Sequence, residues 1–312
     1  KTGAKEKLQK ILENKEKKLF FKKHNYTDSS DLAECIVELK SFKPDVILSL
    51  GGGAVLDLAK IANCLYDEEN YIDKIKNETL LIKKKFTTLI AIPTTAGSGA
   101  EVTSNAVLYI NKKKYSVEGK QILPDFSFID PELVMSLPKT LSAAAGFDAV
   151  SQSIESIFSL KSNKESIEFA LKSLDYSLNN IETHINNKSF SSAYNMCNAS
   201  FLSGKAINIS KTTAPHAVSY PFTSFWGIPH GHAVSLTLID FVEYNFKNKD
   251  KSAANFDLNK RFQLIFDALK IKDIEGLKFK INQILNAIDL ETNLKELKIN
   301  SSQDIEKIIQ NV

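Results

Sequence analysis

The chain has 312 residues, of which 43% are hydrophobic, and a formal net charge of +3. This length suits about two domains. Its basic residues include a single arginine, Arg261, and the lysines are interspersed with acidic residues, which argues against nucleic-acid binding. Cys35, Cys64 and Cys197 form no Cys-x-x-Cys pair, which favours a reducing compartment. No apolar run nears the roughly 20 residues that span a bilayer. We therefore expect a soluble, cytoplasmic protein that is neither membrane-bound nor a nucleic-acid partner.

The first 137 residues combine amphipathic helices with short apolar runs. We expect helices over 4–13, 32–40 and 54–65, strands over 19–21, 45–50, 86–92, 102–110 and 126–129, and a turn at 27–30. The runs at 45–50 and 86–92 are continuously apolar, as in strands buried on both faces of a parallel sheet. The pattern predicts an α/β domain over residues 1–137.

After Pro138 the strand signals nearly disappear. Amphipathic stretches predict helices over 142–158, 162–185, 191–209, 230–245, 258–269, 277–288 and 303–309. The second domain, residues 138–312, is therefore expected to be all-helical.

Two loops rich in small residues follow the two buried strands. The first, Gly51-Gly52-Gly53, joins a strand to a helix whose N-terminus can bind a pyrophosphate. The second runs from Pro93 to Thr103 and is rich in glycine, serine and threonine. Ligands of open α/β sheets bind beyond the carboxyl ends of the strands. A glycine turn can simply pack a helix on a strand, but two such loops together favour dinucleotide binding.

Asp148, His216 and His230 are the candidate metal ligands. Asp148 lies in a predicted helix, and His230 follows Pro229 at the start of another. Two imidazoles and one carboxylate leave a coordination position open for substrate or water, as a Lewis-acid catalyst requires. A lone histidine is more often structural, but the Pro-His-Gly setting and the carboxylate favour ligation.

Five segments of the chain resemble the iron-containing (group III) alcohol dehydrogenases. They are GGGAVLDLAK, IPTTAGSGAEVTSNAV, DPELVMSLP, AAAGFDAVSQSIES and HAVSYPFTSFWGIPHGHA, in the family's order. The resemblance implies the dehydroquinate synthase-like fold, with an N-terminal dinucleotide-binding domain, an all-α C-terminal metal domain and a site in the cleft between them. It also implies that the family's first strand precedes Lys1. Homodimers are common in such families, and we keep one as a possibility.

Site roles follow from the matched positions. The resemblance implies NAD(H) or NADP(H), and Fe(II) or Zn(II) held by Asp148, His216 and His230. Lys114 matches a lysine near the nicotinamide ribose and is also a candidate catalytic residue. The implied cofactor-binding residues are Gly51, Gly52, Gly53, Asp57, Thr94, Thr95, Ser98, Thr103 and Lys114.

The chain departs from the family at two important positions. Gln152 stands where the family has a fourth ligand, a histidine four residues after the aspartate. Tyr220 replaces a second family histidine, and its phenol is a candidate proton donor. Three-ligand versions of this fold work with zinc, so either metal remains open.

We therefore expect an NAD(P)-dependent, metal-assisted oxidoreductase that interconverts an alcohol and an aldehyde or ketone. The run from Lys211 to Tyr220 resembles phosphonoacetaldehyde reductases, enzymes of phosphonate metabolism, and Lys211 with its neighbouring hydroxyls suits a phosphonate. A generic short-chain aldehyde reductase is the simpler option. Two alternatives remain: a dehydroquinate synthase-like lyase, against which the near absence of arginine argues, and a decayed nucleotide-binding protein without catalysis.

Overall fold

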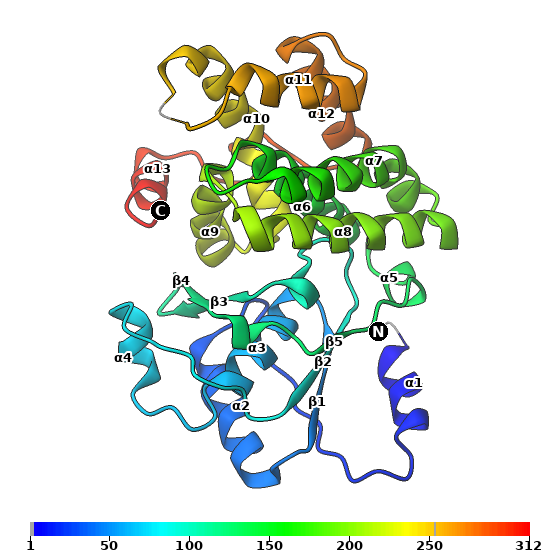
Figure 1. The fold of residues 1–312 in the computed structure, drawn as a ribbon, viewed down its shortest axis with the longest axis vertical. Coiled ribbons are helices and arrows are strands. Elements are labelled where there is room, and N and C mark those ends of the chain that lie inside the picture. Colours follow the sequence, from blue (N-terminus) through cyan, green and yellow to red (C-terminus); the bar gives the residue numbers. More distant parts are fainter. Residues whose placement is uncertain (1–2, 253) are drawn as a thin grey trace. The chain divides into compact units, whose positions relative to one another are not determined.

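The computed structural model describes residues 3–252 and 254–312 and divides into two compact units. The first, here called the α/β unit, comprises Lys1–Thr95 and Ala100–Leu137. The second, the helical unit, comprises Pro138–Val312 together with the short segment Ala96–Gly99. Figure 1 shows strands and helices in the first and helices throughout the second, which confirms the predicted fold class.

A three-stranded parallel sheet forms the centre of the α/β unit. Its order is β1 (Val46–Gly51), β2 (Thr88–Pro93) and β5 (Phe126–Ser127). In the register of β1 and β2, Gly51 lies opposite Pro93, so both strands end at the same edge of the sheet. The two small-residue loops therefore begin side by side.

Helices and a hairpin complete the α/β unit. The helices are α1 (Ala4–Ile11), α2 (Ser29–Phe42), α3 (Gly53–Cys64), α4 (Tyr71–Lys76) and α5 (Glu132–Met135). Strands β3 (Asn105–Ile110) and β4 (Lys113–Glu118) pair antiparallel as a separate sheet. An apolar core joins α2, α3 and β3 through Leu32, Ile61 and Leu108.

The short strand expected at 19–21 was wrong. These residues have no regular secondary structure. Leu19 and Phe21 are largely exposed and only Phe20 packs against the core, so the apolar run marks one anchoring side chain rather than a paired strand. The turn expected at 27–30 instead begins α2, because the side chain of Asp28 accepts a hydrogen bond from the Ser30 N–H and caps the helix.

Eight helices of the helical unit lie within its described residues. They are α6 (Lys139–Phe158), α7 (Lys164–Asn186), α8 (Phe190–Ser210), α9 (Ala214–Trp226), α10 (His230–Lys247), α11 (Leu258–Leu269), α12 (Ile274–Ala287) and α13 (Ser302–Ile309). Helix α9 was not predicted, because Pro215 and Pro221 suppress the helix signal. Pro215 lies in the first turn, where its missing N–H costs no helical hydrogen bond, whereas Pro221 lies inside the helix.

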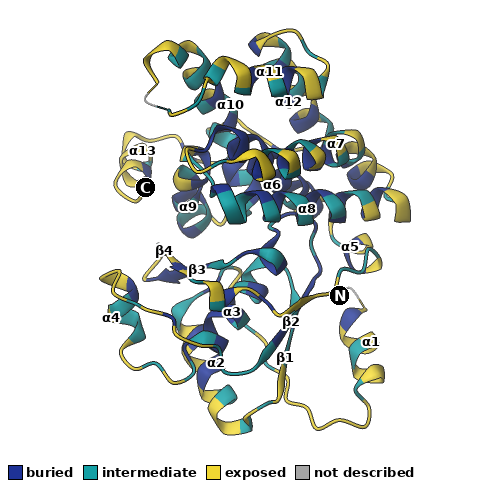
Figure 2. Ribbon diagram, viewed as in Figure 1, coloured by how far each residue is buried: buried dark blue, intermediate teal, exposed yellow. Residues whose placement is uncertain are grey.

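Helix α6 is the central element of the helical unit. It contacts α7, α8 and α10, and nearly every residue from Ser142 to Phe158 is buried (Figure 2). Small residues dominate its sequence, which lets the neighbouring helices pack closely. Across residues 3–252 and 254–312, none of the helices combines the length and apolar character needed to cross a bilayer.

Candidate metal centre

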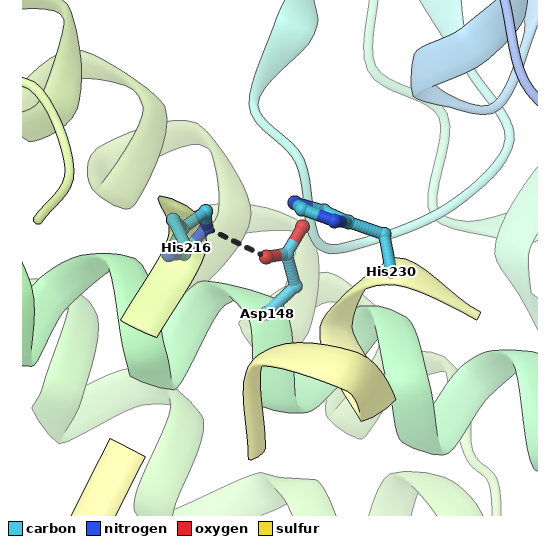
Figure 3. A group of neighbouring side chains, drawn as sticks. All are labelled: Asp148, His216 and His230. Carbon is cyan, nitrogen blue, oxygen red and sulfur yellow. Dashed lines mark ion pairs between the residues drawn. The ribbon is translucent and has the colours of Figure 1, made fainter. Parts of the chain in front are cut away.

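Three helices bring Asp148, His216 and His230 together. Asp148 lies in the middle of α6, His216 in the first turn of α9 and His230 at the first residue of α10. One potential ligand atom from each residue lies within 4.8 Å of the other two, and Figure 3 shows the carboxylate between the two imidazoles. The three residues chosen from the sequence thus lie close together in the structure.

Gly231 allows His230 to reach this position. A Cβ atom built at Gly231 would lie 2.0 Å from the carbonyl oxygen of Ala144 and 2.7 Å from Cβ of Asp148. Only glycine therefore lets the first turn of α10 approach α6 so closely. The adjacent residue, His230, is carried to the carboxylate by this contact.

The donor atoms fit a divalent cation. His216 Nε2 lies 3.3 Å from Asp148 Oδ1, an ion-pair distance, yet neither buried atom completes a hydrogen bond among the described residues. Buried polar atoms left in this way are uncommon. Two ligands bound to one ion at about 2.1 Å lie at most about 4.2 Å apart, so small side-chain movements would suffice for coordination.

The electrostatics of the cluster favour a protonated, cationic His216 beside an ionised Asp148. Burial lowers the pKa of His216, but the carboxylates of Glu155 and Asp148 outweigh this effect and raise the pKa to about 10. Burial raises the pKa of Asp148, but the nearby imidazoles of His216 and His230 outweigh this effect and bring the pKa below its ordinary value. A bound cation would replace the positive charge that His216 carries without it.

Glu155 is a residue of this centre that the sequence reasoning missed. His216 Nδ1 donates to its Oε1 at 2.5 Å, and the Glu155 side chain is almost fully buried. Its position was available as a signal, because Glu155 follows Asp148 by seven residues, which is two helical turns, and so lies on the same face of α6.

The two positions that depart from the family have defined partners. Gln152 Oε1 accepts a hydrogen bond from Ser203 Oγ at 2.9 Å, and its Nε2 donates to the carbonyl of Ser98 at 3.3 Å. The amide therefore spans α8 and the segment Ala96–Gly99. The ring of Tyr220 stacks on that of His230, with centroids 5.5 Å apart and an interplanar angle of 13°.

The predicted cofactor loops lie at the carboxyl ends of β1 and β2. Thr94 N–H donates to the carbonyl of Gly51 at 2.9 Å, which ties the two loops together. A Cβ at Gly52 would meet Thr95 Cγ2 at 3.1 Å, so the glycine lets the loops approach. Helix α3 begins at Gly53, and its N-terminal N–H groups point out of the helix at this edge.

Other predicted cofactor residues lie in a buried polar cluster behind this edge. Lys60 Nζ is fully buried and donates to the carbonyl of Ala100 at 2.9 Å, to Thr103 Oγ1 at 3.0 Å and to the carbonyl of Asn105 at 2.6 Å. Asp57 Oδ1 lies 3.5 Å from Lys60 Nζ, and Asp57 Oδ2 accepts a hydrogen bond from the N–H of Val107 at 2.9 Å. The contacts of Asp57 and Thr103 within this cluster hold α3 to residues 100–107.

Ser98 and Lys114 belong to two other segments. Ser98 belongs to the segment Ala96–Gly99 of the helical unit. Gly99 within that segment has a φ of +60°, and a Cβ there would lie 2.4 Å from Gly204 Cα, so the segment packs directly on α8. Lys114 lies on β4 opposite Tyr109, and burial lowers its pKa. The roles of all these residues at a cofactor stay predictions.

Comparison with known proteins gives the same family at both ends of the chain. The model of the family described as iron-containing alcohol dehydrogenase matches residues 1–131. The model described as Fe-containing alcohol dehydrogenase family, C-terminal, matches residues 142–312.

Two relatives illustrate the level of similarity. The aldehyde-alcohol dehydrogenase of Streptococcus pneumoniae is 29% identical over 227 residues, which is 69% of this chain and 26% of that protein. The phosphonoacetaldehyde reductase of Streptomyces viridochromogenes is 30% identical over 229 residues, 70% of this chain and 58% of that protein. The alignments thus span less than two thirds of these relatives.

Solved structures match almost the whole chain. The sulfoacetaldehyde reductase of Bifidobacterium kashiwanohense, solved in complex with NAD+, has a TM-score of 0.87 at 26% identity, covering 99% of this chain and 80% of that one. An iron-containing alcohol dehydrogenase from Thermococcus thioreducens has a TM-score of 0.87 at 22% identity, covering 98% and 80%, and supports the fold alone.

Proposed function

This chain belongs to the iron-containing alcohol dehydrogenase family, and from that premise we propose that it is an NAD(H)-dependent, metal-assisted oxidoreductase that interconverts an alcohol and an aldehyde. The observation that carries the proposal is the convergence of Asp148, His216 and His230 on one point. Family membership alone would not show that a chain without the usual fourth ligand can bind a metal. The grouping of one carboxylate and two imidazoles supports metal binding by this chain.

The three side chains would hold the divalent ion. A bound Fe(II) or Zn(II) ion supplies Lewis-acid polarisation of the substrate's carbonyl oxygen. Asp148 contributes the negative charge of the site. The imidazoles of the buried His216 and the half-buried His230 contribute neutral nitrogen donors once protons leave them. Burial excludes water from Asp148 and His216, which strengthens their electrostatic interactions.

The paired loops of the α/β unit would hold the cofactor. A bound nicotinamide cofactor supplies the hydride. Gly51 and Gly52 keep the backbone accessible, and the N-terminus of α3 offers N–H groups and a positive dipole end to a pyrophosphate. The NAD+ in the Bifidobacterium reductase supports NAD as the cofactor. Lys114, Thr95 and Ser98 remain proposed contacts, and use of NADP remains part of the test.

Tyr220 is the proposed proton donor. Its ring stacks on the metal-binding candidate His230, so its position is fixed relative to the centre. A phenol beside a cationic centre can have a lowered pKa, which favours proton release to the oxygen of the substrate as the carbonyl is reduced.

We propose that the substrate is a short aldehyde with a tetrahedral anionic group, such as phosphonoacetaldehyde, which would be reduced to 2-hydroxyethylphosphonate. Two relatives support this choice, one a phosphonoacetaldehyde reductase and the other a sulfoacetaldehyde reductase. Lys211, between α8 and α9, is the candidate anion-binding side chain. Thr213 is not proposed as an anion-binding residue, because its hydroxyl donates to Glu155.

The test is a reductase assay with purified protein loaded separately with Fe(II) and Zn(II). Phosphonoacetaldehyde, sulfoacetaldehyde and acetaldehyde are compared with NADH and with NADPH, at matched concentrations. We expect the highest kcat/KM for an anionic aldehyde. Equal kcat/KM for acetaldehyde would contradict the proposed substrate class. Below about 0.1 equivalent of bound metal, with no activity after either metal is added, the chain would be a decayed nucleotide-binding protein.

A further inference from the structure

Glu155 connects the candidate metal centre to the start of α9. Its Oε1 accepts a hydrogen bond from Nδ1 of His216 at 2.5 Å. Its Oε2 accepts two more, from the backbone N–H of Thr213 at 2.7 Å and from Thr213 Oγ1 at 2.9 Å. Thr213 is the N-cap residue of α9, so one buried carboxylate binds both the cap and the histidine one turn later.

The two carboxylates of α6 hold His216 from opposite sides. Asp148 Oδ1 lies 3.3 Å from Nε2 of His216, and Glu155 Oε1 lies 2.5 Å from Nδ1 of the same ring. Because Nδ1 carries the hydrogen that Glu155 accepts, Nε2 is left to coordinate an ion. The ring can neither flip nor rotate without losing a charge-assisted hydrogen bond in a buried site.

The second histidine has a weaker version of the same support. Ser219 Oγ donates to the carbonyl of His216 at 2.7 Å and lies 3.3 Å from His230 Nδ1. With its single hydrogen used, the hydroxyl can accept from His230 Nδ1–H, which again leaves Nε2 for an ion. The hydroxyl at Nδ1 of His230 is uncharged, whereas the carboxylate at Nδ1 of His216 is anionic.

We infer that Glu155, itself fixed by Thr213, is the positioning residue that orients His216 for metal binding and increases its donor strength. The inference rests on the proposed function, because it requires that the centre bind a metal. It extends that function from three ligands to a five-residue unit in which α6 provides both the ligand Asp148 and the support of the ligand His216.

The experiment measures Zn(II) affinity by competition with a chromophoric chelator on the 312-residue chain. We expect Glu155→Gln and Glu155→Ala to weaken Zn(II) binding about 10–100-fold, the usual effect of losing such a partner of a ligating histidine. Thr213→Val removes one donor to Glu155 and should weaken binding severalfold, whereas Thr213→Ser retains the hydroxyl and should bind like wild type. The Thr213 pair keeps the test valid if the Glu155 variants fold poorly.

Ser153→Ala is the matched control. Ser153 is equally buried on α6, but its hydroxyl donates to Ser173 Oγ, away from the centre. The absorption bands of Co(II)-loaded protein give a second measurement, since they report ligand geometry, and we expect them to change in Glu155→Ala and Thr213→Val but not in Ser153→Ala.

Two results would separate the possible failures. If wild type binds Zn(II) and the Glu155 and Thr213→Val variants bind it equally well, or if Ser153→Ala weakens binding as much as they do, the positioning role is overturned while the proposed function stands. If wild type itself binds neither Zn(II) nor Fe(II), the proposed function fails together with the inference.

Discussion

Ser203 Oγ donates a 2.9 Å hydrogen bond to Gln152 Oε1, one turn of α6 beyond Asp148. The amide oxygen that could have approached an ion is thereby directed to α8. The candidate centre therefore offers three protein donors, whereas the resemblance to the family implies a fourth at this position. The first prediction concerns this position.

Gln152→His should raise the affinity for Fe(II). An imidazole four residues after Asp148 lies on the same face of α6 and can add a nitrogen ligand. Because even outer partners of a metal site alter affinity about 10–100-fold, a gain of at least about tenfold is expected. Anaerobic Fe(II) titration measures it, with Gln152→Ala as the control that loses the amide without adding a ligand. Equal Fe(II) affinity in wild type and Gln152→His would show that position 152 cannot reach the ion.

His216→Ala should destabilise the metal-free protein more than His230→Ala. Removing one partner of a buried charge pair lowers the free energy of unfolding by about 3–5 kcal/mol. In His216→Ala the carboxylate of Glu155 would remain buried without the imidazolium that balances its charge. His230 is less buried than His216 and has an uncharged hydroxyl rather than a carboxylate at Nδ1, so its loss should cost less. Urea unfolding in the presence of a chelator measures the difference. The double variant His216→Ala/Glu155→Gln should recover part of the loss, and a merely additive loss would argue against the pairing.

Tyr220→Phe should lower kcat without changing metal affinity. The substitution keeps the ring that stacks on His230 and removes only the hydroxyl. General acid catalysis contributes about 10²–10⁴-fold, so kcat should fall by about 10²-fold or more. Steady-state kinetics and Zn(II) titration are compared for Tyr220→Phe and Tyr220→Ala. An unchanged kcat in the Phe variant would assign Tyr220 to packing.

Glu101 should make the protein less stable as the pH rises from about 4.5 to about 7. Burial raises the pKa of Glu101 from 4.5 to about 7, against the opposing effect of Lys60, and its Oε2 has no hydrogen-bond partner within the described part of the chain. The folded state therefore holds a proton that the unfolded state releases near pH 4.5. Stability attributable to this group is full below about pH 4.5 and is lost between there and about pH 7, by about 3 kcal/mol.

Glu101→Gln removes this titration. Denaturant unfolding of both proteins at several pH values from 5 to 8 should give stability curves that diverge, with wild type losing more as the pH rises. Parallel curves would indicate that the carboxyl is solvated or paired in solution.

Gly231→Ala should disrupt the metal centre through the backbone. The new Cβ would clash with the carbonyl of Ala144 and with Asp148. Helix α10 must then move away from α6 and carry His230 with it, so we expect both weaker Zn(II) binding and a lower free energy of unfolding. Gly276→Ala, in α12, is the control, since its Cβ would come no closer than 3.1 Å to Ile271. Normal Zn(II) affinity in Gly231→Ala would contradict the role given to this contact.

The sequence by itself predicted much of the fold. Amphipathic patterns predicted helices over the residues of α6, α7, α8 and α10, although α6 is buried nearly all round. Continuous apolar runs identified β1 and β2, because such runs are typical of the strands of a parallel sheet. The sequence did not predict β4, which begins with two lysines and buries only Val117, or α9, where two prolines mask the helix.

The candidate ligands Asp148, His216 and His230 were also chosen from the sequence, since residue type and local setting identify groups that can ligate a metal. Only the tertiary structure brought them to one point and added Glu155 and Thr213. It also directed Gln152 toward Ser203. Hydrogen bonds between residues 51 to 61 positions apart, as in the pairs of Gln152 with Ser203 and of Glu155 with His216, leave no periodic trace in the chain, because they depend on how α6 packs against α8 and α9.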